Sequence, residues 1–323
     1  MNMSELRDAL ETRQIAIYFG AALLGVGAAF AIPGVTSLEQ AINPALALML
    51  FVTFLQVPLA ALGQAFKSVR FIGALLTVNF IVVPVIVAAL TQMLPADPLI
   101  RLGVLMVLLC PCIDYVVTFA HLRKGDARLL LAATPVLLIV QMLLLPLYLQ
   151  GFLGADASAL VQPGPFLHAF LWLIAIPLML AFVCQTLSFR VSSGQRVVEG
   201  LGLLPVPATA LVLFIVVASV LPQMNLALDA AASVLPTYVA FAVIAPLAGW
   251  LVARAFRLPT PAARSLAFSA ATRNSLVVLP LALAVPGAVP ILPAIVVAQT
   301  LVELIAELVY VQIIPRFGAR RPA

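Results

Sequence analysis

One short stretch combines chemically active side chains with a helix breaker: Cys110-Pro111-Cys112-Ile113-Asp114, inside an apolar segment from about 102 to 122. Pro111 lacks a backbone N–H and its ring clashes with the preceding turn, so a helix is expected to break there. Asp114 adds a carboxylate whose unpaired insertion into a bilayer costs about 2.5–3.5 kcal/mol. In hydrocarbon, freed backbone groups persist only where they face protein or a water-filled cavity. The stretch therefore predicts a polar site on an interrupted membrane helix, as found in transporters.

A second interrupted helix is predicted between 263 and 286, where the polar string Ser269-Ala270-Ala271-Thr272-Arg273-Asn274-Ser275 stands in the centre of an apolar run. A buried Asp and a buried Arg cost less together than either does alone. If the two interrupted helices cross, we expect Asp114 and Arg273 to approach each other. The pair would then either hold the two breaks together or handle substrate and protons.

Two further carboxyl groups, Glu303 and Glu307, lie within the apolar run 291–314. They are one helical turn apart and so share one face of a helix. Two like charges on that face would not both ionise comfortably. Together with Asp114, they are candidates for carrying a coupling proton; the alternative is a carboxyl that is hydrogen-bonded to backbone near the cytoplasmic end.

The three cysteines, Cys110, Cys112 and Cys184, all lie in apolar segments. The Cys-Pro-Cys spacing matches neither a Cys-x-x-Cys redox motif nor a paired zinc motif, and no metal site is predicted. Cys184 is expected to pack as a small hydrophobe. Cys112 directly follows the predicted break, where its sulfur either packs or binds a soft, thiophilic species.

The composition restricts the class of protein. With 64% apolar and 9% charged residues, the chain has too little polar surface to cover a soluble domain of 323 residues, and we expect a polytopic membrane protein. The basic residues are scattered singly, which argues against nucleic acid as a partner. No phosphate loop or Ser/His catalytic grouping is present, so neither a cofactor nor an enzyme is expected. An intramembrane enzyme with Cys112 as nucleophile would need a base, and His121 lies about 13 Å along the helix.

Ten apolar runs are long enough to span a bilayer. They cover residues 14–32, 44–63, 71–94, 101–122, 129–150, 166–189, 197–221, 230–253, 263–286 and 291–314. With a cytoplasmic N-terminus, fifteen of the seventeen Lys and Arg residues fall in the N-terminal segment, the inner loops or the C-terminal segment, leaving Arg101 and Arg273. This bias predicts a multi-pass protein of the inner (plasma) membrane with both termini in the cytoplasm. No cleavage site follows the first run, so no removable signal peptide is expected.

The ten runs divide into two sets of five, 14–150 and 164–314. An odd number of spans reverses the orientation of the second set, which predicts two inverted repeats. Interruptions recur at matching places in both sets: the break at Pro111 matches the polar string around Arg273, and Asn79 with Pro84 matches Pro246 with Gly249. We expect Pro111, Asn79 and Pro84 to act as structural helix breaks. The fold class predicted is an all-α membrane protein of ten helices.

Several motifs resemble one known family. The run from Cys112 to Asp126, which ends in Leu-Arg-Lys-Gly-Asp, is similar to the fourth-helix motif of the arsenical-resistance permeases in the bile acid:sodium symporter superfamily. Asn79-Phe80 with Pro84 resembles the third helix of that family, Phe268 to Asn274 its ninth helix, and Leu301-Val302-Glu303 its tenth helix. The chain departs from the family pattern at Ala120, where the family has Asn, and at Ser275-Leu276, where it has Glu.

This resemblance implies a panel domain of helices within 14–63 and 166–221 and a core domain of helices within 71–150 and 230–314. It also implies that the fourth and ninth helices cross at unwound centres. The implied activity is efflux of arsenite, or of antimonite, driven by the proton gradient. The expected substrate-binding residues are Cys112, Asp114, Arg273, Asn274 and Ser275.

The sodium-coupled branch of the superfamily provides an alternative, the transport of a small organic anion with sodium or protons. In the register of that branch, Ser269 and Arg273 stand where it has the Glu and Gln that help to bind sodium. A fixed cation argues against sodium at that place but could hold an organic anion. The expected partners are a small-molecule substrate, arsenite or an organic anion, and the lipid bilayer; a homodimer is left open.

Overall fold

The computed structural model describes residues 3–56, 68–113, 115–154, 163–188, 194–222 and 227–318. Within these ranges the regular structure is helical, apart from one isolated β-bridge between Pro111 and Arg273. The prediction of an all-α protein is therefore confirmed. The chain forms two compact units, and each is described by itself.

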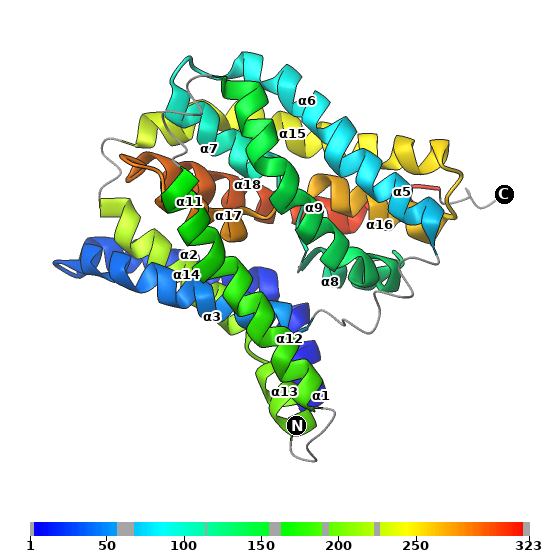
Figure 1. Ribbon diagram of the computed structural model, residues 1–323, viewed down its shortest axis with the longest axis horizontal. Coiled ribbons are helices and arrows are strands. Elements are labelled where there is room, and N and C mark those ends of the chain that lie inside the picture. The colour runs from blue at the N-terminus through cyan, green and yellow to red at the C-terminus, as the bar shows by residue number, and fades with distance from the viewer. Residues whose placement is uncertain are drawn as a thin grey trace. The chain divides into compact units, whose positions relative to one another are not determined.

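The first unit comprises residues 1–57, 160–230 and 279–297. Its main helices are α1 (Met3–Thr12), α2 (Gln14–Ala31), η1 (Val35–Ala41), α3 (Ile42–Phe54), α11 (Pro163–Phe170), η5 (Leu171–Ala175), α12 (Ile176–Ser188), α13 (Gly194–Leu201) and α14 (Pro205–Val220). Helix α14 packs along α2, η1 and α3, and α12 packs on α3 (Figure 1). A Cβ atom at Gly25 would lie 2.9 Å from the Phe214 carbonyl oxygen. The close approach of α2 to α14 therefore depends on a residue without a side chain.

The second unit comprises residues 58–159, 231–278 and 298–323. The helices that lie in it wholly or in part are α5 (Val69–Thr77), η3 (Val78–Val82), α6 (Val83–Leu90), η4 (Thr91–Met93), α7 (Pro98–Leu108), α8 (Tyr115–Leu122), α9 (Ala127–Leu153), α15 (Leu228–Ala255), α16 (Thr260–Ala271), α17 (Ser275–Leu283), α18 (Ile291–Ile313) and η7 (Ile314–Arg316). Helix α16 packs against α5, α8 and α9, and α9 also contacts α7 (Figure 1). All the residues predicted to carry chemistry belong to this unit.

The third predicted span does not break at Asn79 and Pro84. Instead, α5 continues through the π-helical turn η3 into α6. Because Pro84 has no N–H, the Phe80 carbonyl four residues earlier loses its helical donor. The Tyr148 hydroxyl on α9 donates to that carbonyl at 2.5 Å. A partner from another helix thus satisfies the released carbonyl and allows the helix to continue.

Among the described residues, seven helical segments are long and apolar enough to cross a membrane: 14–31, 35–54, 69–93, 127–153, 196–220, 228–255 and 291–316. Two other predicted spans are interrupted, 101–122 between α7 and α8 and 263–286 between α16 and α17. The predicted span 166–189 is not interrupted, because α11 continues through the π-helical turn η5 into α12. Apolar side chains spaced by four residues, Ile139, Leu143 and Leu147, are exposed on α9. An exposed apolar stripe of this kind suits a lipid environment. The chain is a multi-pass membrane protein, and the count of ten spans remains a prediction.

Candidate transport site

Both interruptions predicted from the sequence occur in the second unit. Helix α7 ends at Leu108 and α8 begins at Tyr115. Helix α16 ends at Ala271 and α17 begins at Ser275. The described residues between these helices, 109–113 and 272–274, are buried and outside regular helices, so their backbone groups need partners other than helical ones.

The two extended segments provide those partners for each other. The Cys112 N–H donates to the Thr272 carbonyl at 3.1 Å, and the Asn274 N–H donates to the Cys110 carbonyl at 2.8 Å. These two bonds enclose the antiparallel bridge between Pro111 and Arg273. The two interrupted helices therefore meet at their breaks.

The Arg273 side chain is fully buried and surrounded by oxygen atoms. Its Nη2 donates to Asn79 Oδ1 at 2.9 Å, to the Ser269 carbonyl at 2.6 Å and to the Ala270 carbonyl at 2.8 Å. Its Nη1 donates to the Leu108 carbonyl at 3.3 Å. The three carbonyls lie in the last turns of α16 and α7, where helices have unsatisfied acceptors and a partial negative charge. The C-terminal ends of both interrupted helices therefore converge on one guanidinium.

Two side chains from other helices complete the surroundings of the guanidinium. The Phe241 ring centroid on α15 lies 5.4 Å from Arg273 Cζ, within the range of a cation–π contact. Asn79 on η3 is held by donating its Nδ2 to the Leu75 carbonyl and to Ser269 Oγ, both at 3.1 Å. Its Oδ1 is thereby oriented toward Arg273.

The buried carboxyl group of Glu303 on α18 is tied to the second break. Its Oε2 accepts the backbone N–H of Arg273 at 2.8 Å and Nε2 of Gln299 at 2.5 Å. The Ser275 hydroxyl donates in turn to Gln299 Oε1. Glu303 therefore stabilises the extended backbone at the break, and Gln299 links it to the first residue of α17.

Glu307 lies one turn further along α18 and is fully buried. Its Oε1 accepts the Thr272 hydroxyl at 2.8 Å, whereas its Oε2 has no hydrogen-bond partner within the described residues. The side-chain oxygen of Asn274 accepts the Val277 N–H at 3.3 Å, while its Nδ2 has no partner in the same part of the chain. Both side chains thus retain polar atoms that a proton or solute can engage.

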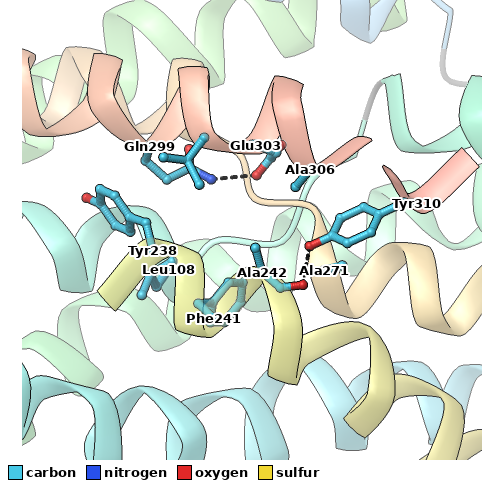
Figure 2. A pocket seen from close by; sticks show the side chains of 10 residues that line it. Leu108, Tyr238, Phe241, Ala242, Ala271, Gln299, Glu303, Ala306 and Tyr310 are labelled. Atoms are coloured by element: carbon cyan, nitrogen blue, oxygen red, sulfur yellow. Dashed lines mark hydrogen bonds between the residues drawn. The ribbon is translucent and has the colours of Figure 1, made fainter. Parts of the chain in front are cut away.

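A small pocket lies between α15 and α18 beside the breaks (Figure 2). It is lined by Leu108, Tyr238, Phe241, Ala242, Ala271, Gln299, Val302, Glu303, Ala306 and Tyr310. Figure 2 shows Gln299 and Glu303 reaching toward it from α18, while the Tyr310 hydroxyl donates to the Ala242 carbonyl at 2.5 Å. Among the lining residues, Glu303 supplies the one carboxyl group.

Some of the site residues predicted from the sequence lie at this crossing. Cys112, Arg273, Asn274, Ser275, Glu303 and Glu307 lie at it or contact it. Asp114 lies outside the described residues, so the Asp114–Arg273 pair stays a prediction. Gln299 was not predicted; its position four residues before Glu303, on the same helix face, was the available signal. Asn79, expected to be a helix break, is instead a partner of Arg273.

Buried polar groups at crossed helix breaks in a membrane protein are typical of secondary transporters. The model of the sodium bile acid symporter family matches residues 43–227, more than half of the chain. The chain therefore belongs to the sodium bile acid symporter family and is a membrane transporter of that kind. None of the curated proteins compared with the chain matches it. The resemblance to the superfamily is confirmed, and the arsenical-resistance branch remains a prediction.

Proposed function

We propose that this protein is a proton-coupled secondary transporter that exports arsenite, and also antimonite, across the plasma membrane. The observation that carries the proposal is the presence of a buried arginine and two buried carboxyl groups at the same crossing. Arg273 is enclosed by protein oxygens, and Glu303 and Glu307 lie beside it on α18.

The surroundings of Arg273 argue against sodium coupling at this place. In transporters, carbonyls at helix breaks and the C-terminal ends of half-helices coordinate the coupling cation. Here such oxygens hold a guanidinium that is covalently part of the chain. A sodium ion 4 Å from that charge would meet a repulsion of about 4 kcal/mol at an effective dielectric constant of about 20. We therefore infer that the arginine takes the place of a mobile cation.

The carboxyl groups supply a proton-coupled alternative. Glu303 lines the pocket, and Glu307 retains an oxygen without a hydrogen-bond partner in the described residues. Two buried carboxyls one turn apart do not both ionise readily, so a proton on one of them changes the charge of the crossing by one unit. Proton uptake and release there can favour different conformations.

The substrate assignment depends on Cys112, which is buried at the first break. Trivalent arsenic binds thiol sulfur strongly, and arsenite at neutral pH is an uncharged hydroxide that needs no cationic site. An organic anion would have to displace protein oxygens from Arg273. Transport of an organic anion with sodium or protons remains the second candidate, because the name of the family describes bile acid transport with sodium.

The overall architecture is part of the same proposal. We infer two inverted repeats, 14–150 and 164–314, with both termini cytoplasmic and the panel and core helices as the family resemblance implies. The repeats are supported by the matching breaks of α7–α8 and α16–α17. A homodimer remains open.

Everted membrane vesicles test the proposed function. Arsenite uptake should require a vesicle interior that is more acidic than the medium, and it should stop when a protonophore is added. An imposed sodium gradient should not change the rate of uptake. Vesicles that lack the protein provide the background rate. Sodium-driven uptake of taurocholate without any uptake of arsenite would reject arsenite export in favour of the organic-anion function.

A further inference from the structure

Contacts in the second unit recur at a constant sequence offset. The Tyr148 hydroxyl donates to the Phe80 carbonyl and the Tyr310 hydroxyl to the Ala242 carbonyl; each pair is 68 residues apart. The second contact lies 162 residues after the first (310 minus 148, and 242 minus 80). The bridge between Pro111 and Arg273 joins residues with the same offset (273 minus 111).

The hydrogen bonds of the bridge obey the same relation. Adding 162 to residues 110 and 112 gives residues 272 and 274. The bond from the Asn274 N–H to the Cys110 carbonyl and the bond from the Cys112 N–H to the Thr272 carbonyl are therefore images of each other. Helices α7 and α16, which begin at residues 98 and 260, are related in the same way. A local two-fold relation thus passes through the crossing.

Under this relation Glu303 on α18 corresponds to Gln141 on α9 (303 minus 141 is 162). Glu303 accepts the backbone N–H of Arg273. The residue equivalent to Arg273 is Pro111, which has no N–H to offer. Gln141 therefore stands at the position from which Glu303 accepts a backbone N–H, but Pro111 has no N–H for Gln141 to accept.

The amide of Gln141 is left with unused hydrogen-bonding capacity. Its side chain is 1% exposed, and neither Oε1 nor Nε2 has a hydrogen-bond partner among the described residues. The polar residues around Glu303 have apolar or weakly polar counterparts in the first half of the chain: Leu145 corresponds to Glu307, Leu137 to Gln299 and Cys110 to Thr272. Burying an amide without a partner is unfavourable, so a bound solute or water is expected to satisfy it.

We propose that Gln141 is a substrate-contacting residue on the first-repeat side of the crossing. Its amide presents an acceptor and two donors, which suit an uncharged solute that carries hydroxyl groups. This inference rests on the proposed function, in which arsenite, an uncharged trihydroxide, is such a solute and Cys112 supplies the sulfur. Gln141 then selects for hydroxyl groups, whereas the thiol selects for arsenic.

The position of Gln141 is tested without any substrate. Pro111→Ala restores an N–H at residue 111, which Gln141 Oε1 should accept. In the purified proteins, the unfolding midpoint of Pro111→Ala should therefore be about 2 °C or more higher when Gln141 is present than when it is replaced by Gln141→Leu. Gln14→Leu is the matched control, because Gln14 on α2 is also buried with an Nε2 that lacks a partner in the described residues. An equal effect of Pro111→Ala with and without Gln141 would overturn the placement.

The role of Gln141 is tested with arsenite itself. Gln141→Leu should keep the wild-type unfolding midpoint, because it removes an unpaired amide, yet reduce arsenite uptake at least tenfold and abolish stabilisation by arsenite. Gln14→Leu should retain both. Unchanged uptake, or a lowered midpoint or lost membrane insertion in Gln141→Leu, would make the residue structural and overturn the proposal. If the wild type neither takes up nor binds arsenite, the proposed function fails, and the Pro111→Ala comparison alone decides where Gln141 lies.

Discussion

At the scale of single residues, Arg273 is the most constrained charge in the described part of the chain. Four protein oxygens accept hydrogen bonds from its Nη1 and Nη2, and three of them are backbone carbonyls at helix ends. Removing the guanidinium leaves these acceptors facing one another without a donor. The charge is therefore expected to contribute to folding as well as to transport.

Arg273→Ala should lower the free energy of unfolding by about 3–5 kcal/mol, the usual cost of removing one partner from a buried charged network. Because the emptied oxygens resemble a cation site, added sodium should raise the unfolding midpoint of the variant while leaving the wild type unchanged. Thermal unfolding in sodium or choline chloride at equal ionic strength measures this effect.

Arg264→Gln provides the control, because Arg264 also donates to backbone carbonyls, those of Pro315 and Phe317. It should lose stability without any response to sodium. A response to sodium in the wild type, or none in Arg273→Ala, would contradict the view that the arginine replaces a mobile cation.

Cys112→Ser separates sulfur chemistry from packing. Serine is close to cysteine in shape but lacks a soft ligand atom, so the variant should insert normally and lose most arsenite transport. Cys184→Ser should have little effect on the arsenite tolerance that the protein confers on a sensitive strain. Growth of an arsenite-sensitive strain and uptake by vesicles measure the outcome; full activity of Cys112→Ser would assign the thiol to packing and favour the organic-anion function.

At the scale of elements, two long helices continue through internal prolines with the help of a tyrosine. Pro246 on α15 deprives the Ala242 carbonyl of its helical donor, and Tyr310 replaces it. Pro84, Phe80 and Tyr148 form the same arrangement at η3. Tyr148 thus connects α9 to η3, and Tyr310 connects α18 to α15.

Tyr310→Phe should therefore cost about 1–3 kcal/mol of unfolding free energy, because a buried carbonyl loses its donor. In a Pro246→Ala background the cost should be much smaller, since the restored N–H at residue 246 returns to the Ala242 carbonyl. Denaturation of the four purified proteins measures the difference. Equal costs in the two backgrounds would show that the hydroxyl acts elsewhere.

At the scale of the whole molecule, orientation in the membrane follows from the distribution of basic residues. We expect a cysteine introduced at Gln162, in a variant without the native cysteines, to react with an impermeant thiol reagent from outside the cell. A cysteine at Ser193 should react only after the membrane is permeabilised. Both positions lie outside the described residues. The reverse pattern of labelling would reject the ten-span topology.

The sequence by itself determined the class of protein and the location of its two interruptions. An apolar content of 64% requires a membrane environment, and Pro111 and the polar string around Arg273 prevent continuous helices locally. These effects act within a few residues, so they are visible in the chain without knowledge of its partners. The family resemblance rests on the same local motifs, and the matched family model confirms it at the level of the superfamily.

The tertiary structure alone decided which groups satisfy one another. Arg273 donates to Asn79, which lies 194 residues earlier in the chain, and Thr272 donates to Glu307, 35 residues later. The helix at Pro84 continues because Tyr148, 68 residues from Phe80, reaches the released carbonyl. Such partners depend on how distant helices pack, and a sequence pattern records only that a buried polar group needs a partner, not which residue provides it.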